Sequence, residues 1–159
     1  MIDLKFKRVI NAPINQVWNV IAGEFTEAHK WAAGTPKCRK GTKAEGYDRV
    51  CETESGTLKD TIIKMDKDNY LLEFSVEGLP FFVRSVVSTW TLKKISDTQT
   101  ELTMGPRIDV IPVIGTILQF PMKIALNKLY PELLNDLAIY TETGKPSPRK
   151  QKELDKATV

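Results

Sequence analysis

The chain has 159 residues, a formal net charge of +3, 42% hydrophobic and 27% charged residues. This composition is typical of one globular domain with a sizeable core, and no apolar run is long enough to cross a bilayer as a helix. Residues 145–159 hold five basic and two acidic side chains, which accounts for the whole excess and leaves residues 1–144 without net charge. The absence of net charge over residues 1–144 argues against a nucleic-acid-binding face.

The first third of the sequence predicts one strand followed by two short helices. Residues 2–10 alternate apolar and polar side chains, as a half-buried strand does. Pro13 suits the first position of a helix, and a second short helix is predicted over residues 27–31. The apolar residues after Pro13 share one helical face: Ile14, Val17, Trp18 and Ile21.

The cysteines and the N-terminus bear on the compartment. Cys38 and Cys51 have no metal-ligand spacing, and the N-terminus lacks the basic and apolar segments of a signal peptide. We therefore expect reduced thiols in a cytoplasmic protein.

The middle of the chain predicts an antiparallel meander. Its strand-like runs are separated by short turn sequences, whereas parallel neighbours would need long crossovers. The runs are 47–54, 57–66, 69–77, 82–95 and 99–110. Gly105-Pro106 interrupts the last run, which predicts a bulge or bend there or, alternatively, a gap for ligand entry.

A long helix is predicted from about residue 114 to 143. Pro131 lies within it and predicts a kink. The apolar, proline-rich segment 108–122 is either a packed lead-in to this helix or a mobile lip. Residues 145–159 predict a basic, flexible tail, although Ser147-Pro148 can start a short helix. The apolar stripe of the long helix has spacings of three and four: Met122, Leu126, Leu129, Leu133, Leu137 and Tyr140.

The order of elements gives an α+β fold. A curved antiparallel sheet needs a cover for its concave face, and the long helix is the obvious cover. The first short helices would close one end of the sheet, with Trp18 as the apolar body of that plug.

Three motifs resemble those of one superfamily. "INAPINQVWNVI" followed by Phe25 and Trp31, then "GYDRVCETESGTLKDTIIKMD", then "LLNDL" in the long helix resemble the START-like (SRPBCC) superfamily. The nearest branch is the polyketide cyclase/dehydrase and lipid-transport group. The resemblance covers residues 2–143 and implies a single domain over 1–144 with the helix-grip fold. In this fold a bent antiparallel sheet, here of six to seven strands, wraps around the C-terminal helix and leaves a cavity between. Members range from lipid carriers to aromatase/cyclases and plain binding modules, so the motifs imply the fold more firmly than an activity.

The strand phases place several polar side chains toward the apolar interior. The phase of run 57–66, and with it that of Asp60, is ambiguous, and one bulge would reverse the phase of any strand. From the long helix, Leu126 and Tyr130 complete the predicted ligand-binding set. Its members on the strands are Arg49, Cys51, Asp60, Phe74, Arg84, Ser88, Trp90 and Met104.

Arg49, Asp60 and Arg84 allow two interpretations, because charged side chains are almost never buried unpaired. One is an Arg–Asp bridge that satisfies itself beneath the helix, or side chains that reach solvent at the rim of the sheet. The other is a polar anchor that orients a carboxylate, phenol or carbonyl of a bound ligand.

Two functions follow from these residues. The first is binding of a hydrophobic small molecule, such as a lipid, a polyketide-like compound or an isoprenoid, in an internal cavity. The alternative is a polyketide cyclase/dehydratase-type enzyme in which an inward Arg polarises a carbonyl and Asp60 acts as a base. We assign no catalytic residue, because His29 is the only histidine and no nucleophile–histidine or metal-ligand pattern is present. We expect no metal, no cofactor, no nucleic-acid partner and no stable membrane insertion, in a monomer or homodimer.

Overall fold

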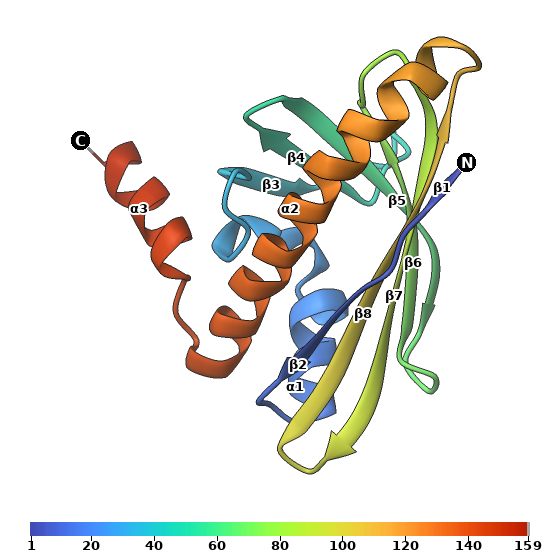
Figure 1. Cartoon of the computed structure of the whole chain (residues 1–159). Coiled ribbons are helices and arrows are strands. Elements are labelled where there is room, and N and C mark those ends of the chain that lie inside the picture. The colour runs from blue at the N-terminus through green and yellow to red at the C-terminus, as the bar shows by residue number, and fades with distance from the viewer. Residues whose placement is uncertain (159) are drawn as a thin grey trace.

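The computed structural model describes residues 1–158. It is built on an antiparallel sheet with the strand order β1–β8–β7–β6–β5–β4–β3, and β2 also pairs with β8 (Figure 1). The strands are β1 (Ile2–Asp3), β2 (Phe6–Ile10), β3 (Lys37–Lys40), β4 (Arg49–Thr53), β5 (Gly56–Asp66), β6 (Leu71–Glu77), β7 (Val83–Ser96) and β8 (Gln99–Val110). The predicted meander and its antiparallel pairing are confirmed.

Strands β1 and β2 form one interrupted strand along β8. Ile2 pairs with Ile108 and Phe6 with Met104, and between them the N–H of Leu4 donates to the carbonyl of Pro106 (3.1 Å). Counted as one, they give a seven-stranded sheet, which lies within the predicted six to seven strands. β8 is continuous through Gly105 and Pro106 and keeps its register against β7 there, so the bulge or bend predicted at this point is wrong.

The chain between β2 and β3 forms α1 (Ile14–Trp18), a π-helical turn η1 (Asn19–Gly23) and a 3₁₀ segment η2 (Phe25–Lys30). Trp18 is buried in the main core, and its ring meets the Tyr70 ring edge-on at 5.8 Å. Trp18 therefore has the packing role that its place in the sequence predicted.

Helix α2 (Ile114–Thr143) crosses the face of the sheet and packs against β2 and β8 (Figure 1). It has the predicted bounds and is continuous through Pro121 and Pro131, so the kink at Pro131 stays a prediction. Gly144, with a φ of +71°, ends it in the left-handed conformation that glycine adopts most easily.

The two halves of α2 differ in burial. The second half buries five residues, of which Leu134, Leu137 and Ala138 belong to the main core. The first half is mostly exposed, although Met122 and Leu126 pack on a small second core of Ile2, Val86 and Ile108. The predicted cover over the sheet is therefore tightest at the C-terminal end of the helix.

A further helix, α3 (Pro148–Ala157), lies in the stretch that we expected to be a flexible tail. Ser147 caps it by accepting a hydrogen bond from the N–H of Lys150 (3.2 Å), so the helix predicted as the second option is present. The Lys150 side chain is fully buried, and its Nζ donates to the carbonyl of Thr35 (3.1 Å). Residue 159 lies outside the described residues.

Cys38 and Cys51 face each other across β3 and β4 and form a disulfide. The expectation of reduced thiols is therefore wrong. The error arose because the sequence around Cys38 shows no clear strand pattern, so its pairing with β4 could not be predicted. Disulfides are typical of oxidising compartments, so the cytoplasmic assignment loses its main support. No helix within residues 1–158 has the length and apolarity needed to span a membrane.

Candidate ligand-binding site

A buried ion pair lies on the concave side of the sheet. Arg49 on β4 and Asp60 on β5 are direct cross-strand partners, and the Nε and Nη2 of the arginine each lie 2.6 Å from Asp60 Oδ2. Arg49 is 8% exposed and Asp60 only 3%. Both point inward as predicted, and a bulge between Ile62 and Lys64 explains why the alternation along this strand was ambiguous.

Aromatic rings enclose the arginine. Its Nη1 donates to the carbonyl of Phe25 (2.8 Å), and its guanidinium carbon lies 3.9 Å from the centre of the Phe25 ring and 5.4 Å from that of Phe74. A cation over aromatic faces is stabilised by the ring quadrupoles. Phe25 was not predicted as a site residue, because its contact with Arg49 joins two segments that only the folded chain brings together.

The two carboxylate oxygens of Asp60 differ. Arg49 uses Oδ2, whereas Oδ1 accepts no hydrogen bond from residues 1–158. Oδ1 is not fully buried, because it is not one of the sealed polar atoms without a partner. The pair thus leaves one carboxylate oxygen without a protein partner on a residue that is only 3% exposed.

Tyr130 of α2 belongs to the same region. Burial raises the pKa of Tyr130 to about 12, with a hydrogen bond from Ser88 opposing this shift and the negative charge of Asp60 adding to it. Burial also raises the pKa of Asp60, and the charge and hydrogen bond of Arg49 oppose that rise. Tyr130 is therefore a neutral phenol at physiological pH. Its ring is stacked on Phe6, with the ring centres 4.8 Å apart.

Four other predicted residues are buried in the interior as expected: Phe74, Ser88, Trp90 and Met104. Trp90 Nε1 donates to Ser88 Oγ (2.8 Å), and the Trp90 and Phe74 rings meet edge-on at 5.5 Å. Met104 has no exposed surface, so its place is in the packed core.

Arg84 does not point inward, which corrects the prediction that it joins Arg49 and Asp60. Its side chain is 57% exposed and lies 3.5 Å from Asp109 in a surface ion pair. The register against β8 shifts between Val83 and Ser85, so Arg84 lies in a bulge that reverses its phase relative to the rest of β7. The polar group is thus Arg49 and Asp60 alone.

Cys51 and Leu126 are placed differently from the polar pair. Cys51 is buried two residues along β4 from Arg49, but its sulfur is bonded to Cys38 and offers no free thiol. Leu126 is partly buried against the small second core, one helical turn before Tyr130.

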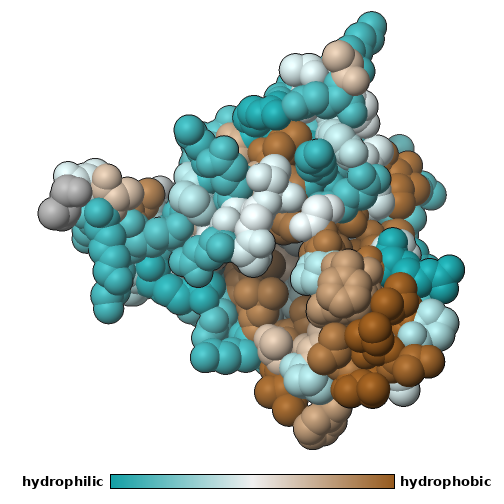
Figure 2. Space-filling view, turned by 90° about the horizontal axis from the view of Figure 1, so that it is seen from above, coloured by the Kyte–Doolittle hydropathy of each residue, from teal (hydrophilic) through white to brown (hydrophobic). Residues whose placement is uncertain are grey.

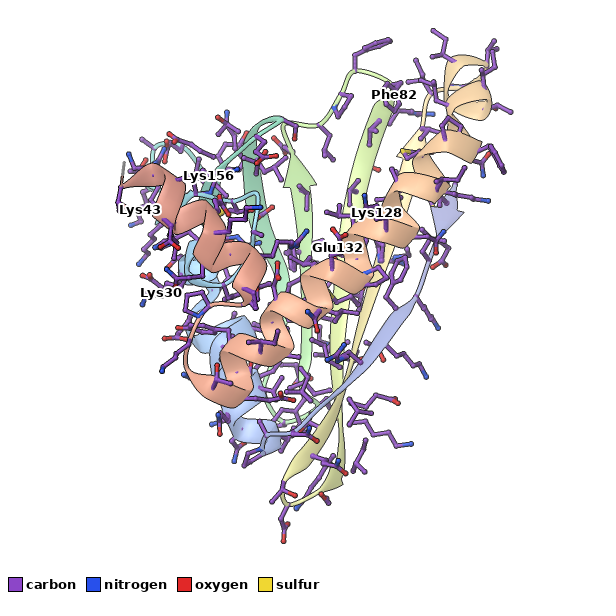
Figure 3. All side chains as sticks on the ribbon, turned by 60° about the vertical axis from the view of Figure 1, so that its left-hand side comes forward. Lys30, Lys43, Phe82, Lys128, Glu132 and Lys156 are labelled. Carbon is purple, nitrogen blue, oxygen red and sulfur yellow. A yellow bond between two sulfur atoms is a disulfide. The ribbon has the colours of Figure 1, made fainter. Side chains whose placement is uncertain are left out.

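Two hollows open along α2. The larger has a volume of about 380 Å³, which is within the range of small-molecule sites. Its lining residues are Met122, Ala125, Leu126, Lys128, Leu129 and Glu132, of which Figure 3 labels Lys128 and Glu132. The smaller, about 260 Å³, is lined by Lys5, Phe6, Lys7, Arg8, Pro131 and Leu134. Arg49 and Asp60 line neither hollow, and Leu126, which lines the larger one, lies one helical turn before Tyr130.

No cluster of three or more His, Cys, Asp or Glu side chains within residues 1–158 is arranged to hold a metal ion. His29 lies 3.6 Å from Glu27 through Nε2, and its buried Nδ1 has no hydrogen-bond partner. The chemistry available in the interior is therefore that of a carboxylate, a guanidinium, a phenol and a hydroxyl.

A curved antiparallel sheet covered by a long C-terminal helix, with a polar pair buried between them, defines a helix-grip domain. The family model described as "Polyketide cyclase / dehydrase and lipid transport" matches residues 1–142. The chain belongs to this family, which supports a ligand-binding or cyclase role. No curated protein sequence matches the chain at a significant level.

Solved structures share the fold at low sequence identity. The Zhui aromatase/cyclase from Streptomyces sp. R1128 is 13% identical with a TM-score of 0.71, over 89% of this chain and 93% of that one. The di-domain ARO/CYC BexL from the BE-7585A biosynthetic pathway is 12% identical with a TM-score of 0.74, over 87% of this chain and 45% of that one. An uncharacterised protein from Bacillus thuringiensis is 17% identical with a TM-score of 0.70, over 88% and 98%. At these identities the likeness shows the fold alone.

Proposed function

We propose that the protein binds a hydrophobic small molecule with one polar group, such as a lipid, a polyketide-like compound or an isoprenoid, between the sheet and α2. The observation that carries this proposal is the buried Arg49–Asp60 pair with one carboxylate oxygen unused. A buried ion pair gains little over apolar residues of the same volume, so stability alone is a poor reason to keep one. An anchor for a ligand gives the pair a use.

The chemistry of the pair favours a neutral polar group on the ligand. Arg49 and Asp60 neutralise each other's charge, so the pair presents no net charge to a ligand. Asp60 Oδ1 offers an acceptor and the Tyr130 phenol offers a donor. A hydroxyl, phenol or carbonyl uses these groups without bringing a second buried charge, whereas an ionised carboxylate would lie near Asp60. The apolar part would extend past Leu126 into the larger hollow along α2.

A thermal-shift screen tests this proposal. Long-chain alcohols, sterols, fatty acids and aromatic polyketides are added to the protein, and a ligand at a hundred times its dissociation constant should add about 2.7 kcal/mol to the free energy of unfolding. Tyr130→Phe should weaken the binding of ligands that carry a hydroxyl or carbonyl and leave the binding of plain hydrocarbons unchanged. Tyr47→Phe is the matched control, because the Tyr47 hydroxyl bonds Glu77 at the surface (2.8 Å). A flat response across the whole set would contradict the proposal.

A cyclase/dehydratase reaction is the second candidate, and the raised pKa of Asp60 beside a neutral phenol favours it. Asp60 would take a proton from a carbon next to a ketone while Tyr130 donates a hydrogen bond to the ketone oxygen. The aromatase/cyclase names of two structural neighbours agree with this chemistry. Incubation with a short poly-β-ketone thioester separates the two candidates. Cyclisation that Asp60→Asn abolishes without loss of binding would support the enzyme, and unchanged product ratios relative to buffer would support the binding protein.

A further inference from the structure

Exposed apolar side chains gather at the end of the molecule where α2 begins. We call this surface the apolar tip; Phe81, Val113, Ile117 and Phe120 in it are 78%, 72%, 72% and 74% exposed. Figure 2 shows a broad hydrophobic area on this end of the molecule, and Figure 3 labels Phe82 there. Scattered exposed apolar residues are ordinary, but a contiguous patch marks a contact surface. The tip comprises Phe81, Phe82, Val113, Ile114, Ile117, Phe120 and Ile124.

Two segments far apart in the sequence build the tip. The N–H of Ile111 donates to the carbonyl of Phe82 (2.9 Å), which fixes the β6–β7 loop beside the start of α2. A tight turn from Pro112 to Ile114 then holds Val113 outward with a φ of +70°, a rare conformation for a β-branched residue. The chain therefore keeps an unfavourable backbone conformation at a residue whose apolar side chain is exposed.

The first half of α2 is apolar on two faces. Met122 and Leu126 pack inward on the small core, whereas Ile117, Phe120 and Ile124 point away from it and are exposed. A surface helix normally places polar residues on its outer face. The outer face of this half is therefore typical of a helix face that contacts another surface when the protein functions.

The two segments that build the tip carry only positive charges. Neither the loop and strand segment 78–92 nor the segment 110–131 contains an Asp or Glu, and their charged residues are Arg84, Lys123 and Lys128. Arg84 is paired with Asp109, but Lys123 and Lys128 make no ion pair with residues 1–158.

We propose that the apolar tip docks reversibly on an anionic lipid membrane surface, with its phenylalanines and isoleucines inserted among the acyl chains and Lys123 and Lys128 at the headgroups. Aromatic and aliphatic side chains flanked by Lys are the combination that binds such interfaces. A second copy of the chain fits poorly, because an isologous contact would bring the lysines of two tips together. Residues more than 70% exposed also protrude, which suits a deformable lipid surface better than a preformed protein groove. The proposal does not depend on a ligand in the interior.

Vesicle flotation tests it with the whole chain. Vesicles of phosphatidylcholine with phosphatidylglycerol should carry the protein upward at low salt, and pure phosphatidylcholine vesicles should carry much less. Phe120→Ser should weaken binding about tenfold or more, since burial of one Phe is worth that factor at least. Lys123→Gln and Lys128→Gln should each weaken it about fivefold on anionic vesicles. The matched controls are Ile63→Ser, 53% exposed on β5, and Lys43→Gln, far from the tip in Figure 3; both should bind like the wild type.

Two results would overturn the proposal: no flotation with anionic vesicles, or flotation that Phe120→Ser leaves unchanged. Analytical ultracentrifugation runs in parallel. A dimer that Phe120→Ser disrupts, without vesicle binding, would assign the tip to a second copy and reject the membrane. Tyr130→Phe should weaken the binding of ligands in the interior and leave vesicle flotation unchanged. The two measurements therefore test the interior site and the apolar tip separately.

Discussion

Two buried carboxylates in this protein are held in different ways. Asp136 of α2, 1% exposed, accepts hydrogen bonds on both oxygens: from Ser147 Oγ at 2.6 Å, Arg149 Nη2 at 2.6 Å and the N–H of Ala33 at 3.2 Å. Asp60, 3% exposed, is held by Arg49 through one oxygen only. Asp136 is saturated by the protein and fastens α2, α3 and the loop after η2 together. Asp60 keeps an acceptor that the protein does not use, which distinguishes a binding group from a structural one.

The largest expected effect is at the interior pair. Asp60→Leu should lower the free energy of unfolding by about 3–5 kcal/mol, because it leaves the Arg49 charge buried alone. Arg49→Met added to Asp60→Leu should restore most of that loss. Urea unfolding of the two single variants and the double variant gives the coupling energy. Additive effects below 1 kcal/mol would mean that both side chains are solvated and that the pair is no anchor.

Removal of the disulfide should lower the free energy of unfolding by nearly as much, because the bond ties the edge strand β3 to the strand that carries Arg49. Cys38 and Cys51 are 13 residues apart, and a closed loop of this size stabilises by about 3 kcal/mol in the chain-entropy model. Cys38→Ala with Cys51→Ala should cost about that much in urea unfolding. Thiol titration of the unfolded, unreduced protein should find no free cysteine; two reactive thiols would show that the bond does not form.

Asp136→Leu should cost less, about 1–3 kcal/mol, because the N–H of Ala33 and the hydroxyl of Ser147 lose their acceptor. Arg149→Met should not rescue it, since Arg149 is 41% exposed and keeps Glu132 as a partner at 2.6 Å. Limited proteolysis should cut within α3 faster in this variant, with ligand binding in the interior unchanged. Full rescue by Arg149→Met would make the two carboxylates equivalent and remove the contrast between them.

The pH dependence gives the smallest effect. Burial raises the pKa of Asp60 in the folded state, so the folded protein holds this proton more tightly than the unfolded chain. The stability that the proton contributes is complete below the unfolded value of about 3.8 and is lost as pH rises through the raised folded-state pKa. The stability of the wild type relative to Asp60→Asn should therefore fall with rising pH across that window. A relative stability that rises instead would place Asp60 in a solvated pair.

The sequence predicted what depends on local pattern. The bounds of α2, the meander and the inward phase of Phe74 and Trp90 all follow from period and turn chemistry within one segment. The motifs of the family then supplied the arrangement of these elements in space.

The errors share one cause, which is that they depend on pairing between segments. Arg84 points outward because a bulge adds one residue to β7, and apolar alternation does not reveal bulges in advance. The disulfide depends on the register of β3 against β4, and the buried Lys150 depends on a carbonyl at Thr35 that only the folded chain brings near. Phe25 meets Arg49 through both its backbone oxygen and its ring, and only the folded chain brings these two segments together.

Native mass spectrometry of freshly purified protein tests directly whether a ligand lies between the sheet and α2. We expect a population heavier than the bare chain by one apolar molecule with a hydroxyl, phenol or carbonyl, or uptake of such a molecule from an added long-chain alcohol. Tyr130→Phe should lose this adduct and Tyr47→Phe should keep it. A bare mass in every preparation, with no uptake from any neutral apolar compound offered, would contradict a ligand site between the sheet and α2.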